Sequence, residues 1–169
     1  MKLEEPKIYK NIFKINDDSR GFLFADSVRE ILSKVGLDEF IIKYQLISKT
    51  DLSATFRGFH YQTEPYMQNK IILLISGKIK DFVFPFNNPK KENVKSFIVE
   101  KGDALVVPKN YAHGFLTLSD NVLMQYFMDQ EFDENSYKGI NGYNYIKDVE
   151  NIENIIISDK DRTLNKIIQ

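Results

Sequence analysis

The chain contains no cysteine and only two histidines among its 169 residues. The absence of cysteine excludes disulfides, thiolate metal ligands and cysteine nucleophiles. Two histidines without a carboxylate at ligand spacing make a poor site for a transition metal. We therefore expect a metal-free protein.

A block of charge of one sign is also missing, because the net charge is −1 and no basic run or tail is present. This gives little electrostatic support for binding nucleic acid. The longest apolar runs, such as Ile71–Ile75, are too short to span a bilayer, and residues 1–6 lack a hydrophobic signal core. We expect a cytoplasmic protein with no membrane or nucleic-acid partner, in which a local group of Arg and Lys is still compatible with a phosphate-bearing small molecule.

The composition, 43% hydrophobic and 13% aromatic residues, is that of a globular protein. At this length one domain over residues 1–169 is expected, and no internal repeat or linker divides it. Short segments rich in Ile, Val, Phe and Tyr, separated by turn residues, predict an all-β barrel or sandwich. The predicted strands are 40–47, 71–86 with a break at Gly77-Lys78, 96–99, 104–107, 114–118 and 122–128.

Two helical segments are predicted outside the strands. Ser27 to Glu30 forms a capping box, Ile31 and Leu32 supply an apolar stripe, and Gly36 ends the helix. After Ser158, a short C-terminal helix is indicated by apolar spacing at Leu164, Ile167 and Ile168.

The most informative polar pattern is the run Arg-Gly-Phe-His-Tyr-Gln at 57–62, followed by Lys70, His113 and Tyr126. A base, a cation and a phenol on strands are what proton transfer next to a carbonyl requires. The base removes a proton, the cation stabilises the oxyanion, and the phenol returns a proton. Each residue taken alone also fits an ordinary sheet position, but the set in this order favours chemistry.

A second pattern runs from Gly102 through Pro108 to His113, with five and then four residues between them. It resembles the second half of the cupin signature, in which a histidine points into a β-barrel. The first half lacks the usual His-x-His pair, because Gly58 and Phe59 precede His60 without a second histidine nearby. This supports a cupin jelly roll without a metal.

Taken together, the motifs resemble those of the dTDP-4-dehydrorhamnose 3,5-epimerases, small cupins that act on nucleotide-linked 4-keto-6-deoxy sugars. The resemblance extends over nearly the whole chain. The motifs that carry it are Asp-Ser-Arg-Gly-Phe at 18–22, Arg-Gly-Phe-His-Tyr-Gln at 57–62, Lys70, Asp81, Ala-His-Gly-Phe at 112–115, Tyr126 and Ser-Asp-Lys-Asp at 158–161.

The resemblance implies an epimerase without a cofactor. A 4-keto group acidifies the hydrogens on C3 and C5, so a base on one face and an acid on the other can invert each centre through an enolate. His60 would be the base, with Asp161 fixing its tautomer. Lys70 would stabilise the enolate oxygen and Tyr126 would return the proton. The alternatives are a solvated turn acid for Asp161, an edge-strand lysine for Lys70 and a packing tyrosine for Tyr126.

The resemblance also implies a set of substrate-binding residues. His113 with Asp81 would line the sugar pocket, or would be a satisfied core histidine. Arg57 and Arg20 would hold the diphosphate, because the guanidinium fork matches phosphate oxygens; the alternative for each is a surface charge. The remaining implied contacts are Gln45, for which a polar strand residue is the alternative, and the aromatic residues Phe22 and Phe132.

The chain departs from the family pattern where the nucleotide should be held. The run Leu46–Asp51 lacks the family's Asn and two Ser, Ala25 and Pro85 stand where acidic residues are usual, and Phe132 replaces a tyrosine. These departures leave two alternatives open. One is an epimerase that inverts C3 or C5 alone, or acts on a sugar not linked to dTDP. The other is a non-catalytic sugar-binding cupin.

The family also implies a homodimer, in which an N-terminal strand crosses to the partner. The expected partner molecule is a nucleoside-diphosphate 4-keto sugar, and the expected pathway feeds a surface polysaccharide or a deoxysugar.

Overall fold

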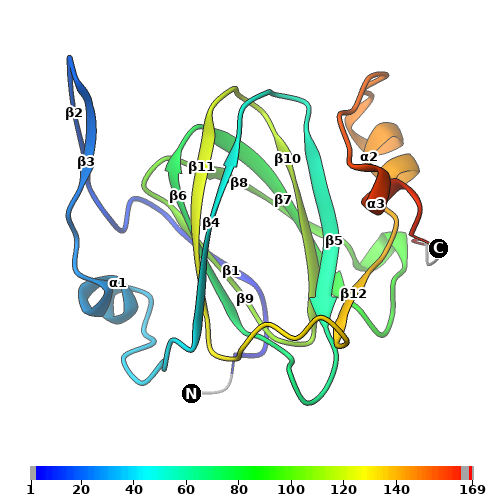
Figure 1. The fold of residues 1–169 in the computed structure, drawn as a ribbon, viewed down its shortest axis with the longest axis horizontal. Coiled ribbons are helices and arrows are strands. Elements are labelled where there is room, and N and C mark those ends of the chain that lie inside the picture. The colour runs from blue at the N-terminus through cyan, green and yellow to red at the C-terminus, as the bar shows by residue number, and fades with distance from the viewer. Residues whose placement is uncertain (1–2, 165–167, 169) are drawn as a thin grey trace.

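The computed structural model describes residues 3–164 and 168, and in these residues two five-stranded antiparallel sheets face each other (Figure 1). The first sheet has the order β1 (Lys7–Tyr9), β9 (Ala104–Val107), β6 (Lys70–Ser76), β11 (Val122–Met128) and β4 (Tyr44–Thr50). The second has the order β12 (Tyr137–Gly139), β5 (Phe56–Gln62), β10 (Tyr111–Thr117), β7 (Lys78–Pro85) and β8 (Lys95–Glu100). The predicted all-β jelly-roll barrel is confirmed.

Apolar side chains fill the space between the sheets and also cover the outer face of each. On β6, Ile72 and Leu74 point into the barrel, whereas Ile71 and Leu73 pack outward. Both faces of this strand are buried, which explains its continuous hydrophobic sequence. The same alternation on β11 places Tyr126 inside and Phe127 outside.

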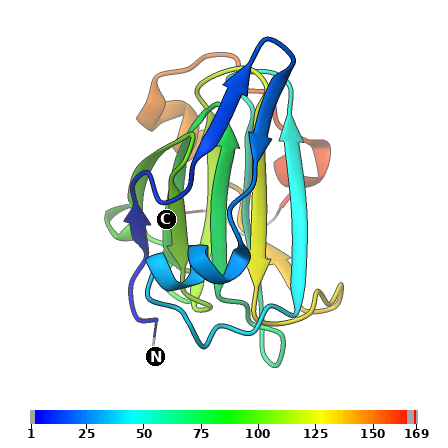
Figure 2. The same cartoon turned by 90° about the vertical axis from the view of Figure 1, so that its left-hand side faces the viewer.

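The outer face of the first sheet is covered by the N-terminal segment and by α1 (Val28–Lys34), as Figure 2 shows. The predicted capping box of Ser27 and Glu30 is present. The helix ends in a Schellman arrangement, because Leu37 N–H donates to Leu32 C=O and Gly36 N–H to Ser33 C=O, with Gly36 at φ +71°.

The outer face of the second sheet is covered by α2 (Tyr143–Glu150) and the segment after it (Figure 1). A short helix follows Ser158 as predicted, α3 (Asp159–Arg162), but it ends before Leu164, so the apolar residues that indicated it lie beyond its end. Of that stripe, Ile167 lies outside the described residues. No helix in the described part of the chain combines the length and apolar character needed to cross a membrane.

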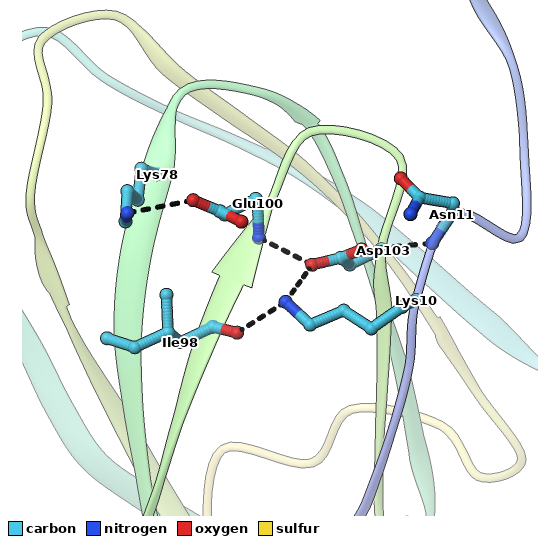
Figure 3. A network of polar contacts seen from close by, with 6 residues as sticks. All are labelled: Lys10, Asn11, Lys78, Ile98, Glu100 and Asp103. Atoms are coloured by element: carbon cyan, nitrogen blue, oxygen red, sulfur yellow. Dashed lines mark hydrogen bonds and ion pairs between the residues drawn. The ribbon is translucent and has the colours of Figure 1, made fainter.

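A buried carboxylate joins the N-terminal strand to the barrel (Figure 3). Asp103, in the turn between β8 and β9, accepts hydrogen bonds from Lys10 Nζ at 2.7 Å, Asn11 N–H at 3.0 Å and Glu100 N–H at 2.8 Å. Lys10 also donates to the Ile98 carbonyl. This network fixes the point from which the chain leaves β1 for the hairpin of β2 (Ile15–Asp18) and β3 (Gly21–Phe24).

That hairpin projects away from the barrel (Figures 1 and 2). Its two strands pair only with each other among the described residues, with Asp18 opposite Gly21 at the turn. It leaves two large apolar side chains, Phe22 and Leu23, 44% and 63% exposed. Such an apolar projection is unusual on an isolated monomer.

The strand predictions agree best in the buried centre of the sheets. The ranges 104–107 and 122–128 match β9 and β11 in full. The range 40–47 was wrong by several residues, because residues 40–43 form no regular secondary structure and β4 runs from Tyr44 to Thr50. β5 had no predicted range, although its His60 was expected on a strand, and β1, the β2–β3 hairpin, β12 and α2 were not predicted.

Candidate active site

A cavity of about 640 Å³ lies between the two sheets. This volume is typical of a small-molecule site. Residues from strands of both sheets line it, together with Phe132 from the loop before β12 and residues of α3. The lining includes Tyr44, Leu46, Ser48, Thr55, Arg57, His60, Gln62, Gln68, Lys70, His113, Tyr126, Phe132, Tyr137, Ser158, Lys160 and Asp161.

His60 projects into this cavity from β5, and its Nε2 lies 2.7 Å from Asp161 Oδ1. The predicted contact is therefore present. Asp161 is buried at the start of α3, where its own N–H donates to the capping hydroxyl of Ser158. Because Nε2 is engaged by the carboxylate, Nδ1 is the ring nitrogen left to take a proton from a ligand.

The glycine of the Arg-Gly-Phe-His run lets β5 approach β10 closely. Gly58 has φ +130°, and a Cβ built on it would lie 2.5 Å from the Gly114 Cα. The same backbone turn directs the Gly58 N–H toward Asp161 Oδ2, at 3.3 Å. Burial by itself raises the pKa of Asp161, but the hydrogen bond and charge of His60, with that N–H, lower the pKa overall. Asp161 therefore stays ionised beside the base.

A second histidine–carboxylate pair lies deeper in the same sheet. His113 Nδ1, on β10, is 3.3 Å from Asp81 Oδ2, on β7. Burial lowers the pKa of His113 and raises that of Asp81, with the partner's charge opposing the shift in each case. Asp81 Oδ1 is buried and has no hydrogen-bond partner among the described residues. Burial therefore favours the neutral form of His113, which lines the cavity.

The cation and the phenol come from the opposite sheet. Lys70, on β6, is buried, and burial lowers its pKa to about 8 against the charges of Asp81 and Asp129. Tyr126, on β11, is buried with its ring centroid 6.0 Å from that of His113. Burial and the charge of Asp81 raise its pKa well above the usual value, while Arg57 acts in the other direction.

Arg57 lies on β5 at the edge of the same cavity. Its Nε donates to Thr50 Oγ1 at 3.1 Å, so that it bridges from one sheet to the end of β4 in the other. No carboxylate within the described residues forms an ion pair with it, which leaves its guanidinium available for an anionic ligand.

The remaining predicted contacts divide into two groups. Phe132 lines the cavity, with its ring stacked on Tyr44 at 6.1 Å. Arg20, Phe22 and Gln45 do not line the cavity of their own chain. Arg20 lies at the tip of the hairpin and pairs with Asp18, and Gln45 is exposed on the outer side of the edge strand β4.

Sequence reasoning missed several cavity residues. Gln62 and Gln68 anchor the loop that carries Phe132, because their amides donate to the carbonyls of residues 130 and 131. Tyr137 and Lys160 also line the cavity. The sequence gives no clear signal for Tyr137, because its three-residue strand is too short to be predicted by periodicity.

No group of three or more potential Asp, Glu or His metal ligands occurs within residues 3–164 and 168. The metal-free character of the site stays a prediction. The arrangement does hold the parts of an acid–base site: a carboxylate-supported imidazole on one wall, and an ammonium and a phenol on the facing wall.

A family model described as dTDP-4-dehydrorhamnose 3,5-epimerase matches residues 2–169 of this chain. The chain belongs to the dTDP-4-dehydrorhamnose 3,5-epimerase family. The enzyme of that name from Shigella flexneri is 25% identical over 99% of this chain and 95% of its own length. The one from Escherichia coli (strain K12) is 28% identical over 98% and 90%.

A solved epimerase structure of this family agrees with the fold. The Bacillus anthracis enzyme, crystallised with TDP and PPi bound, superposes with a TM-score of 0.71 at 25% identity. The alignment covers 96% of this chain and 94% of that one. The chain is thus an isomerase of the carbohydrate epimerase type on a cupin jelly roll.

Proposed function

We propose that this epimerase inverts C3, C5 or both in a nucleotide-linked 4-keto-6-deoxy sugar. The observation that carries the proposal is the placement of the His60–Asp161 pair across one cavity from Lys70 and Tyr126. A base and an acid on facing walls can act on opposite faces of the same sugar ring.

The steps follow from this placement. His60 Nδ1 takes the proton from the carbon next to the ketone, and the imidazolium formed is stabilised by Asp161. The electron pair moves onto the ketone oxygen, where the Lys70 ammonium meets the developing enolate charge. Tyr126 then gives its proton to the opposite face of that carbon. No electron leaves the substrate, so the reaction needs no redox cofactor.

We propose dTDP as the nucleotide, because the relatives named above are dTDP-sugar epimerases and one of them is known with TDP bound. Arg57 is the cation placed to meet a diphosphate. The altered run 46–51 supports the alternatives of another nucleotide or of inversion at one carbon, because Leu46 and Ser48 lie on the cavity wall.

We also propose a homodimer in which the β2–β3 hairpin crosses to the partner. Three features support it: the hairpin projects from the barrel, its strand β3 carries exposed apolar side chains, and β4 is an edge strand with Gln45 on its exposed side. In such a dimer Arg20 and Phe22 would approach the partner's cavity. The proposal further takes residues 1–169 as one domain acting in the cytoplasm, in synthesis of a deoxysugar for a surface polysaccharide such as lipopolysaccharide.

The competing function is a sugar-binding cupin without catalysis. Its support is the same altered wall at Leu46 and Ser48. A binder has no use for a base held by a buried carboxylate opposite a buried lysine, so the preserved acid–base set favours an enzyme.

The deciding experiment incubates the protein in D₂O with dTDP-, CDP-, GDP- and UDP-4-keto-6-deoxy sugars and follows them by proton NMR. An epimerase washes deuterium into C3, C5 or both and produces the inverted sugar. The carbons that lose their proton signals show which centres react, and the preferred nucleotide appears as the fastest reaction. Binding of a sugar without any exchange would show that the protein is a binder.

A further inference from the structure

We propose that Tyr137 is a sugar-contacting residue whose hydroxyl donates a hydrogen bond to an oxygen of the substrate's sugar unit and holds that unit against His60. This inference rests on the proposed epimerase function and deepens it. It concerns a residue outside the base, cation and phenol already described.

The position of Tyr137 follows from strand register. β12 pairs with β5 so that Tyr137 lies opposite Gln62, two residues from His60 on the same face of β5. The Tyr137 ring centroid is 5.2 Å from that of His60, with 39° between the ring planes. A group bound over His60 therefore lies within reach of this phenol.

The ring is held on two further sides. Phe132 packs against it at 5.5 Å, and the Lys160 ammonium lies 4.6 Å from the ring centroid. A cation over a tyrosine ring is an attractive contact. Base, aromatic wall and cation together fix where the hydroxyl points, which is the preorganisation that a binding group needs.

The hydroxyl itself has no hydrogen-bond partner in the part of the chain that the structure describes, although the ring is half-buried in the cavity. Tyrosine hydroxyls in such positions usually find a partner. Tyr111 shows the usual case, because its hydroxyl donates to Glu5 at 3.0 Å. The donor of Tyr137 is left for a ligand.

Position in the cavity separates the role of Tyr137 from that of Tyr126. Tyr126 lies on β11 in the first sheet, opposite His60, whereas Tyr137 lies on β12 in the same sheet as His60. Tyr126 is therefore placed to return a proton to the far face of the sugar, and Tyr137 is placed to hold the sugar on the side of the base. Burial and a nearby aspartate raise the pKa of both phenols, with Asp161 acting at Tyr137 and Asp81 at Tyr126, so Tyr137 keeps its proton as a hydrogen-bond donor.

The test is Tyr137→Phe, with Tyr143→Phe as the matched control. The Tyr143 ring lies on α2 under Arg162 and does not line the cavity. We expect Tyr137→Phe to lower kcat/KM for the sugar nucleotide by about 5- to 10-fold, the effect of losing one neutral hydrogen bond. Melting temperature and the Kd for dTDP alone stay at wild-type values, because the hydroxyl contacts neither protein nor nucleotide.

A further readout distinguishes positioning from proton donation. The ratio of deuterium wash-in to inverted product in Tyr137→Phe should equal that of the wild type, since both steps depend equally on sugar placement. A wild-type kcat/KM in Tyr137→Phe would overturn the inference. So would a raised ratio of wash-in to inversion, which would mark a proton donor, or a weakened Kd for dTDP, which would mark a nucleotide contact.

Failure of the proposed function looks different from failure of this inference. A wild-type protein that exchanges no proton in any of the four 4-keto sugar nucleotides contradicts the epimerase itself, before a variant is made. The inference about Tyr137 then falls with it. An active wild type with an unaffected Tyr137→Phe variant contradicts the inference alone.

Discussion

Lys70 places an ammonium in the barrel interior, where burial lowers its pKa to about 8. The charged form is the one that stabilises an enolate oxygen. The ammonium is fully present below this pKa and is lost as pH rises through it. Catalysis should therefore fall on the alkaline side even though the barrel stays folded.

We expect kcat/KM to decline above about pH 8, roughly tenfold for each further pH unit, because kcat/KM follows the ionisation of the free enzyme. Lys70→Arg is the control, since guanidinium keeps its charge throughout this range. In that variant the alkaline decline should move to higher pH, whatever its activity at neutral pH. An unchanged alkaline limb in Lys70→Arg would assign the decline to another group.

Tyr126 is the proposed donor to the face opposite His60. In Tyr126→Phe the base and Lys70 remain, so deprotonation continues and His60 returns a proton to the face it came from. We expect deuterium to wash in with retained configuration, while inverted product falls by roughly 10²-fold or more. In His60→Ala the base is absent, so we expect neither deuterium exchange nor inverted product. Inverted product at the wild-type rate in Tyr126→Phe would show that the phenol only packs and does not donate the proton.

At the residue scale, sequence motifs led to the groups that carry charge and protons. Arg-Gly-Phe-His and Ala-His-Gly-Phe have fixed local geometry, and the contacts of His60 with Asp161 and of His113 with Asp81 are both present. Tyr137 was missed because its position depends on how a three-residue strand docks on β5. Tertiary docking of this kind leaves no period in the sequence.

At the element scale, the contact of β5 with β10 depends on the absence of a side chain at Gly58. The chain offers a comparison for this test, because Gly21 has nearly the same φ, +136°, but nothing within 4 Å of an added Cβ. At Gly58 the added Cβ would meet the Gly114 backbone. The pair separates backbone strain from overlap.

We expect Gly21→Ala to lower the free energy of unfolding by about 1–2 kcal/mol, the cost of a positive φ in a residue with a side chain. Gly58→Ala should lower it by several kcal/mol more, because two backbones must move apart, and should also displace the N–H that contacts Asp161. Urea unfolding of both variants measures the difference. Equal losses would mean that β5 and β10 tolerate a wider spacing.

The predicted elements agree with the structure where burial alone decides them. β9 and β11 consist mostly of apolar residues because both faces of the first sheet are covered. β4 and β12 lie at sheet edges, where polar and apolar residues mix and pairing with one neighbour sets the ends. The β2–β3 hairpin has little core of its own, so hydrophobic pattern gives no clear signal for it.

At the scale of the whole molecule, the proposed dimer depends on the exposed apolar side chains of β3 in the hairpin. Leu23→Asp puts a charge where the crossing hairpin would be buried, so we expect the variant to sediment as a monomer at micromolar concentration. Val149→Asp is the matched control, because Val149 is also exposed, by 50%, but lies on α2 at the other side of the barrel. A dimer that persists in Leu23→Asp, or a monomeric wild type, contradicts the crossing hairpin.

The proton-removing and proton-returning groups belong to different sheets, which means that no single strand sets the gap between them. That gap is set by the apolar side chains packed between the sheets, such as Ile72, Val83 and Leu105. Facing sheets normally keep a separation near 10 Å because of these side chains. The apolar core therefore sets the distance between the two reacting groups and also contributes to stability. Replacing core residues with larger or smaller ones should alter turnover without any change to a residue that touches the sugar. A substitution that raises the melting temperature by filling the core could therefore lower activity from the same position.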